Sequence, residues 1–190
     1  MISPNDYLTT VMRNFDKLRG MSDQISKAAD ICINSVGTGG KVIFCGNGGS
    51  AADSQHLAAE LIGRFVIDRN PIPALALTVD TSALTAISND FGYEEAFARQ
   101  LHGIGRKGDV LIGLSTSGTS RNVVRAFETA HELGIVRIAM TGETDSPMSA
   151  MADLSLQMPS RICSHIQEMH IAVGHIICGI VEKDSCSDRQ

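Results

Sequence analysis

Short runs dominated by apolar residues alternate with longer amphipathic stretches over most of the chain. The runs fall at residues 41–45, 74–79, 109–114, 136–141 and 154–158. Runs of this length are typical of strands in a parallel sheet that is covered on both faces, whereas the stretches between them have the period of helices. Strands alternating with helices imply right-handed crossovers. We therefore expect an α/β fold, a three-layer sandwich around a parallel sheet of about five strands.

The two ends of the chain are expected to be helical. Residues 4–19 and 22–36 have a helical period and carry no obvious chemical group, so an N-terminal extension over residues 1–38 is expected to serve packing or subunit contact. A final helix is expected over 163–182, followed by a solvated tail at 184–190. No proline-rich or low-complexity linker divides the 190 residues, so the whole chain is expected to form a single domain.

Composition excludes several classes of partner. The net charge of −5 argues against nucleic acid or an anionic membrane as the main partner. No apolar run approaches the roughly 18 residues that span a bilayer, and no secretory signal is visible at the N-terminus. The five cysteines are widely spaced and form no C-x-x-C pair, which is typical of reduced thiols in a cytosolic protein. We expect a cytoplasmic protein that acts on a small molecule.

Two loops of small residues follow two of the expected strands. In open α/β sheets, ligands bind outside the carboxyl ends of the strands, where both loops should lie. The glycines of "CGNGGS" let backbone N–H groups approach an oxygen-rich group, and the helix that follows adds free donors. The loop "STSGTS" puts five hydroxyls within six residues, which suits a terminal phosphate. The alternative is a polar turn in which Thr119 or Ser120 merely caps a helix.

A dinucleotide site is a second interpretation of the first loop. The loop fits a G-x-G-x-x-A fingerprint, and Asp68 lies about twenty residues further on, as a ribose-binding acid would. A dinucleotide site, however, gives the hydroxyl-rich loop no role and does not need His56 or Glu60 on the following helix. A P-loop is excluded because no G-K-[ST] follows the glycines.

Titratable residues gather on two of the expected helices. His56 and Glu60 are four residues apart and share one helix face, although a solvated surface pair has the same spacing. The final helix carries Gln167, His170 and His175 in an otherwise apolar segment. Spacing does not choose between the two histidines of that helix, and either is compatible with simple hydrogen-bonded packing. Two histidines, a glutamate and a glutamine could together form a zinc site.

Four sequence blocks carry a family resemblance. They are "GGKVIFCGNGGSAADSQHLAAELIGRF", "ISNDFGYEEAFARQL", "GDVLIGLSTSGTSRNV" and "IQEMHIAVGHII". Together, in this order and over nearly the whole chain, they resemble the phosphoheptose isomerases of the sugar isomerase (SIS) domain family. The resemblance implies a SIS domain with a flavodoxin-like sheet and the conversion of sedoheptulose 7-phosphate to D-glycero-D-manno-heptose 7-phosphate. This reaction opens the supply of activated heptose for lipopolysaccharide core or capsule.

The same resemblance implies an assembly and a set of functional residues. Members are cytoplasmic homotetramers with N-terminal helices in the subunit contacts and active sites at subunit interfaces. Matching positions imply one zinc per subunit, with the ligands His56, Glu60, Gln167 and His175. Glu60 and His175 match the catalytic pair, so the resemblance selects His175 over His170. Further substrate contacts are implied for Asn47, Gly48, Gly49, Asn89, Asp90, Ser115, Thr116, Ser117 and Ser120, with Glu60 and Gln167 among them and Arg64 as a weaker candidate.

The expected chemistry is aldose–ketose isomerisation through an enediol. Glu60 would move a proton between C1 and C2, while His175 would manage the proton on the carbonyl oxygen. Some SIS relatives are non-catalytic regulators or binding modules, including one that binds the replication initiator protein, and this is the main alternative. Such relatives can lose the acid and base, whereas both are present here. Another sugar-phosphate isomerase or a dinucleotide enzyme is a third interpretation.

One position departs from the family pattern. The family often has arginine just before the I-Q-E block, whereas this chain has His165 preceded by Ser164. We expect this difference to change the contacts next to Gln167.

Overall fold

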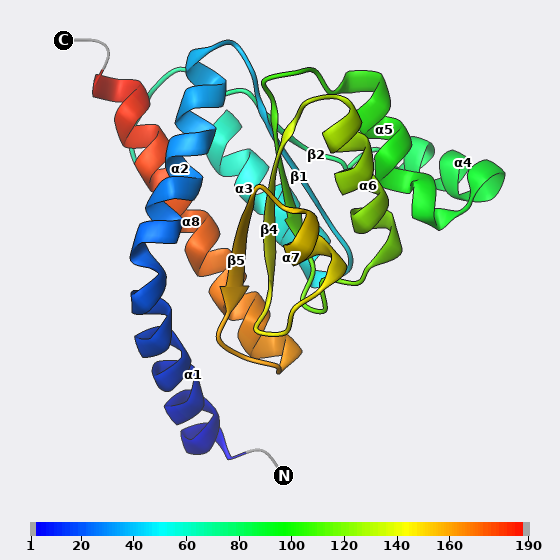
Figure 1. Cartoon of the computed structure of the whole chain (residues 1–190). Helices are drawn as coiled ribbons and strands as arrows, with labels where there is room; N and C mark the ends of the chain where they lie inside the picture. The colour runs from blue at the N-terminus through cyan, green and yellow to red at the C-terminus, as the bar shows by residue number, and fades with distance from the viewer. Residues whose placement is uncertain (1–2, 188–190) are drawn as a thin grey trace.

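The computed structural model describes residues 3–187, and its centre is a sheet of five parallel strands (Figure 1). The strands stand in the order β2-β1-β3-β4-β5. Their bounds are β1 Val42–Gly46, β2 Ala74–Ala76, β3 Val110–Leu114, β4 Val136–Gly142 and β5 Leu154–Met158. This order and the all-parallel pairing confirm the expected flavodoxin-like sheet.

Strands β1 and β3 are neighbours and end at the same level. Their register runs from Val42 opposite Val110 to Gly46 opposite Leu114. From β1 the chain continues to β2 on one side, and from β3 it continues to β4 on the other. The two loops therefore begin side by side at the point where the strand order reverses, which is where open α/β sheets bind ligands.

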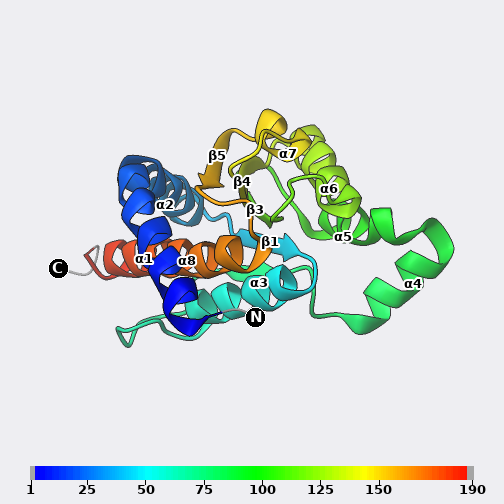
Figure 2. The same ribbon diagram turned by 90° about the horizontal axis from the view of Figure 1, so that it is seen from below.

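Helices cover both faces of the sheet (Figures 1 and 2). The helices of one layer are α2 (Ser22–Gly37), α3 (Gly49–Ile62) and α8 (Cys163–Ser187), with α1 (Pro4–Leu18) extending from it beyond the short 3-10 turn η1 (Arg19–Met21). The other layer holds α5 (Ala96–Ile104), α6 (Arg121–Glu132) and α7 (Pro147–Met151). Helix α4 (Thr81–Phe91) projects at one end, and the turn η2 (Tyr93–Glu95) joins it to α5.

The buried side chains of β1 alternate between the two layers. Val42 and Phe44 belong to the apolar cluster shared with α2, α3 and α8, whereas Ile43 and Cys45 belong to the cluster shared with α5 and α6. Every residue of this strand is buried. A strand that packs on both faces has no polar side, which explains its uninterrupted apolar run.

The structure corrects two expected boundaries and adds one helix. Strand β2 stops at Ala76, three residues short of the expected run at 74–79. Helix α7 was not expected, because its five residues are too few for a period to show. Helix α8 continues to Ser187, so residues 184–187 of the expected solvated tail at 184–190 are helical, and residues 188–190 lie outside the described residues.

The longer α8 has a physical cause. Glu182 is buried and accepts hydrogen bonds from three backbone N–H groups, so the helix is still anchored where the sequence suggested its end. Neither glycine nor proline follows to stop the helix. None of the helices within residues 3–187 combines the length and apolar character that crossing a bilayer requires.

Candidate active site

The glycine loop turns sharply from β1 into α3. Gly48 has a φ of +58°, a conformation that glycine adopts without strain. The next residue, Gly49, is already the first of α3. The loop therefore places Asn47 and Gly48 directly before a helix N-terminus whose first residue is Gly49, as an anion-binding loop requires.

The hydroxyl-rich loop is held by bonds among its own side chains. Ser115 Oγ accepts from the N–H of Gly118 at 3.2 Å and lies 3.0 Å from Ser120 Oγ. Thr119 Oγ1 donates to Ser117 Oγ at 3.0 Å. Ser120 is the N-cap residue of α6, but its side chain makes no capping hydrogen bond. The side chain of Ser120 is therefore free of the capping role that the alternative interpretation gave it.

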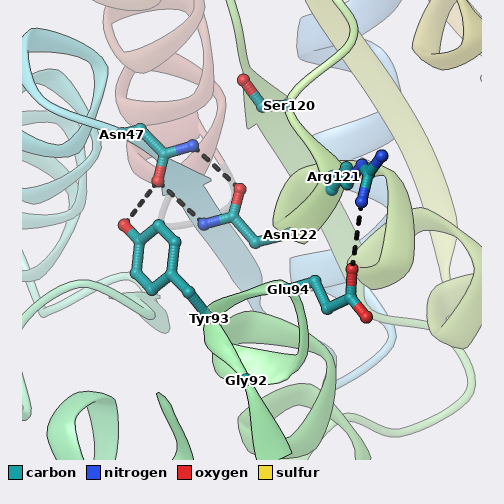
Figure 3. Close-up of a pocket in the computed structure, with 7 residues that line it drawn as sticks. All are labelled: Asn47, Gly92, Tyr93, Glu94, Ser120, Arg121 and Asn122. Carbon is teal, nitrogen blue, oxygen red and sulfur yellow. Dashed lines mark hydrogen bonds and ion pairs between the residues drawn. The ribbon is translucent and has the colours of Figure 1, made fainter.

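A pocket of about 440 Å³ opens beside both loops (Figure 3). Its lining residues come from the glycine loop, from η2 and its flanks, and from the start of α6: Asn47, Gly92, Tyr93, Glu94, Ser120, Arg121 and Asn122. Asn47 and Asn122 form a reciprocal amide pair, with both N···O distances at 2.8 Å. Tyr93 Oη donates to Asn47 Oδ1 at 2.7 Å. These bonds fix the amide of Asn47 at the wall of the pocket.

Sequence reasoning missed Tyr93 and Asn122. Weak signals for both are present, since Asn122 lies two residues after the hydroxyl-rich loop and Tyr93 lies in the same resemblance block as Asn89 and Asp90. Neither signal predicts that Tyr93 and Asn122 form hydrogen bonds with Asn47.

A cluster of three titratable side chains lies between α3 and α8. His56 Nε2 is 3.1 Å from Glu60 Oε1 and 2.9 Å from His175 Nε2. Asp53, one turn earlier on α3, is close enough to interact electrostatically with both imidazoles. Burial raises the pKa of Asp53, and the two histidines oppose this rise. The sequence predicted the pairing of His56 with Glu60 but gave no sign of Asp53.

The three side chains fit a zinc ion by chemistry and by spacing. Two imidazole nitrogens and one carboxylate oxygen are a ligand set of catalytic zinc sites. Ligand bonds of about 2.0–2.1 Å in a tetrahedral site place donor atoms about 3.3 Å apart, close to the observed separations. Among the described residues, this is the group of histidine, cysteine and carboxylate side chains whose ligand atoms converge within 4.8 Å.

The other histidine of α8 has a different environment. His170 is fully buried, and its Nε2 lies 3.3 Å from the carbonyl oxygen of Thr141. Burial lowers the pKa of His170 to about 4, so its imidazole is neutral at pH 7. The structure thus places His175, and not His170, beside His56 and Glu60.

Comparison with known proteins gives the family. The family model of the SIS domain matches residues 6–142 of this chain. The chain belongs to the SIS domain family. Within this SIS family it belongs with the phosphoheptose isomerases, since it is 54% identical over 171 residues to the phosphoheptose isomerase of Akkermansia muciniphila, covering 90% of each chain.

Solved SIS structures agree with this placement. The phosphoheptose isomerase from Neisseria gonorrhoeae is 39% identical, with a TM-score of 0.89 over 94% of this chain and 96% of that one. The phosphoheptose isomerase from Francisella tularensis is 34% identical, with a TM-score of 0.91 over the same shares. The fold expected from the sequence is therefore the fold of these SIS relatives.

The structure brings together only part of the residue set that the SIS resemblance implies. Gln167 is eight residues before His175, about 12 Å along α8, and its amide lies against Gly49, where an added Cβ would be 2.6 Å from Nε2. Within one chain, Gln167 therefore does not reach the cluster. Asn89 and Asp90 are exposed on α4, bonded to each other at 2.8 Å.

The cluster also lies apart from the pocket within one chain. Glu60 is eleven residues beyond Gly49, about 16 Å along the axis of α3. The pocket is lined by residues at the start of α6, whereas the cluster lies on α3 and α8. The helix after the glycine loop is expected to carry its acid into the same pocket, but in a single chain Glu60 is not a lining residue of the pocket in Figure 3. Arg64 is exposed just beyond α3 and is likewise not a lining residue of the pocket.

The departure at His165 has a structural role of its own. His165 is buried, and its Nδ1 is 2.9 Å from Glu168 Oε2. The ring of Tyr7 on α1 lies 4.5 Å from the His165 ring, and the Tyr7 hydroxyl donates to Glu168. This side chain therefore connects α8 to α1 through Glu168 and Tyr7.

Proposed function

We propose that this protein is an aldose–ketose isomerase that converts sedoheptulose 7-phosphate to D-glycero-D-manno-heptose 7-phosphate. The observation that carries the proposal is the cluster of His56, Glu60 and His175, which joins a carboxylate to two imidazoles in a chain that is about half identical to phosphoheptose isomerases. The reaction needs a base that works between two carbons and a second group at the neighbouring oxygens. Glu60 and His175 supply these two groups.

In the proposed mechanism the Glu60 carboxylate takes the proton from one carbon of the C1–C2 pair and returns it to the other. The imidazole of His175 holds or delivers the proton at the carbonyl oxygen, so the intermediate is an enediol. A zinc ion bound by His56, Glu60 and His175 would polarise the sugar oxygens. Gln167 is proposed as a fourth ligand and substrate contact that comes from elsewhere in the assembly.

The phosphate is proposed to bind at the hydroxyl-rich loop. Ser115, Thr116, Ser117 and Ser120 offer hydroxyl groups, and the first turn of α6 offers backbone N–H groups. Asn47, Gly48 and Gly49 are proposed to contact the sugar, with Asn89 and Asp90 completing the set. Phosphate held away from the reacting carbons supplies binding energy for their alignment.

We propose a homotetramer whose active sites are completed at subunit interfaces. The separation of about 16 Å between the glycine loop and Glu60 in one chain supports this, since one substrate must meet both. The exposed apolar side chains of α1, Leu8 at 60% and Met12 at 73%, support a role for the N-terminal extension in the contacts. The proposal treats the whole chain as one SIS domain that works in the cytoplasm, supplying heptose for lipopolysaccharide core or capsule.

The test is incubation of the purified protein with sedoheptulose 7-phosphate, with aldose product followed by NMR. We expect product from the wild type, and loss of product after chelation with recovery on zinc addition. Glu60→Gln should lower kcat by about three orders of magnitude without changing the melting temperature, whereas Glu132→Gln, at an exposed position on α6, should match the wild type.

Three outcomes would contradict parts of the proposal. Near-normal turnover by Glu60→Gln would remove the assigned base. Turnover that is insensitive to chelation would remove the metal alone. Binding of the sugar phosphate without any interconversion would indicate a non-catalytic SIS binding module instead.

A further inference from the structure

A buried ion pair ties the end of α3 to the end of α8. Arg69 Nε lies 3.2 Å from Glu182 Oε1, and both side chains are almost fully buried. The proposed chemistry uses neither group. Buried charges of this kind cost solvation energy and are retained where additional hydrogen bonds satisfy them, so the bonds around this pair indicate what it holds in place.

On the carboxylate side, the pair holds the segment that follows α3. Glu182 accepts from the backbone N–H groups of Phe65, Val66 and Ile67 at 2.8, 2.8 and 3.0 Å. Burial alone raises the pKa of Glu182, but these three donors and Arg69 outweigh it and hold the pKa below its ordinary value. The carboxylate is therefore charged and fixes three consecutive backbone units against α8.

On the guanidinium side, the pair holds the last turn of α3. Arg69 donates to the carbonyl oxygens of Glu60 and Leu61 at 2.9 and 2.8 Å. These carbonyls have no partner within the helix, so Arg69 acts as its C-terminal cap. The same ion pair thus anchors the backbone of Glu60 and the backbone of Phe65.

The ring of Phe65 lies against the imidazole of His175. Their centroids are 5.5 Å apart at an interplanar angle of 29°, a stacked arrangement. His56 approaches the same imidazole, with centroids 5.0 Å apart. Gly179, one turn beyond His175, leaves room for Phe65, since a Cβ there would lie 3.3 Å from Phe65 Cε1.

We propose that Phe65 is a positioning residue for His175, and that the Arg69–Glu182 pair sets the position of Phe65. The aromatic face limits rotation of the imidazole, so that Nε2 stays directed at His56 and Glu60. This inference rests on the proposed function only for its kinetic effect, because the orientation of an imidazole can be measured without substrate. Groups that orient a metal ligand from outside typically change affinity or activity by about 10- to 100-fold.

The test compares Phe65→Leu, which keeps apolar volume but removes the flat face, with Phe65→Tyr, which keeps the face. Phe65→Leu should lower kcat by about 10- to 100-fold and weaken zinc binding, measured by competition with a chromophoric chelator, by about 10-fold. The KM should change less than about twofold. Phe65→Tyr should restore both quantities. The nuclear Overhauser effect between the ring protons of His175 and those of His56, whose centroids are 5.0 Å apart, should weaken in Phe65→Leu and stay at the wild-type level in Phe65→Tyr.

Matched variants separate positioning from folding. Val66→Ala changes a neighbouring exposed side chain on the same clamped backbone and should behave as the wild type. Gly179→Ala, which displaces the ring of Phe65 by a few tenths of an ångström, should give a partial loss. An unchanged His56–His175 Overhauser effect and an unchanged kcat in Phe65→Leu would overturn the proposal, as would an equal loss in Phe65→Tyr. Should the wild type fail to turn over the sugar phosphate, the proposed function falls, while the Overhauser effect still decides the role of Phe65.

Discussion

Gly118 carries two independent constraints at the centre of the hydroxyl-rich loop. Its φ is +66°, and a Cβ would lie 2.1 Å from Ser146 Oγ. Ser146 is not free to move away, because its Oγ accepts from the N–H of Ser149 and caps α7. An added methyl group must therefore strain the loop, uncap α7 or both.

Gly118→Ala is expected to lower the free energy of unfolding by about 2–4 kcal/mol, from left-handed strain and overpacking together. Gly39→Ala is the matched control, since Gly39 has a φ of +86° with no atom within 4 Å of an added Cβ, and should cost only about 1 kcal/mol. Urea unfolding of both variants measures the difference. Equal losses would show that contact with Ser146 contributes nothing.

Residue types and spacings predict part of the candidate site. They do not predict contacts between residues that are distant in the sequence. The i, i+4 spacing of His56 and Glu60 places them on one helix face, and the structure pairs them. Their third partner, His175, lies 119 residues away from His56, so spacing alone could not choose it over His170. The packing of α3 against α8 brings His175, and not His170, next to His56.

The first turn of α6 is joined to the loop after β1 by the amide pair of Asn47 and Asn122. Asn122 is buried, so its replacement cannot be compensated fully by water. Asn122→Ala should lower the free energy of unfolding by about 1–3 kcal/mol, because it removes both hydrogen bonds and leaves the amide nitrogen of Asn47 without its partner.

Two further variants give this element-level prediction its controls. Asn122→Asp keeps the acceptor for Asn47 Nδ2 but sets a buried carboxylate oxygen against Asn47 Oδ1, so a loss at least as large as that of Asn122→Ala is expected in the same urea titration. Asn34→Ala removes an exposed side chain from α2 and should change stability by less than about 0.5 kcal/mol. If Asn122→Ala matched Asn34→Ala, the amide pair would have no role in joining the two elements.

Among the secondary elements, sequence predicts best where a local pattern and tertiary packing agree. Strand β5 has the expected bounds, Leu154–Met158, because its apolar residues alternate with polar ones and pack on one core cluster. The end of α8 was missed because a long-range ion pair with Arg69, not a local stop signal, decides how far the helix stays packed. Helix α7 depends on a capping box at Ser146, which a search for helical period does not detect.

Across the whole molecule, the fold separates the two loops that we propose to bind substrate from the cluster that we propose to react. The two loops share the carboxyl edge of the sheet at the β1–β3 switch point, whereas the His56–Glu60–His175 cluster sits on the layer of α3 and α8. Local sequence patterns predict the loops and the His56–Glu60 pair, but not His175. Their separation follows from the length of α3, which carries Glu60 about 16 Å beyond the loop.

The stability of the whole chain should depend on pH through His170, which joins α8 to β4. This imidazole is fully buried, and burial lowers its pKa from 6.5 to about 4. Between these pH values His170 is protonated in the unfolded chain but neutral in the folded chain. The free energy of unfolding therefore falls as the pH falls from about 6.5 towards 4. At about 1.4 kcal/mol per pH unit, the free energy of unfolding should fall by about 2 kcal/mol between pH 6.5 and pH 5 because of His170.

Urea unfolding at both pH values and at one protein concentration measures this loss of stability. His170→Gln should reduce it by that amount, and His102→Gln, at an exposed position on α5, should leave it unchanged. Working above pH 5 excludes Glu182, whose lowered pKa makes its stabilising effect disappear only in stronger acid. An equal loss in the wild type and His170→Gln would show that other groups govern the response to pH.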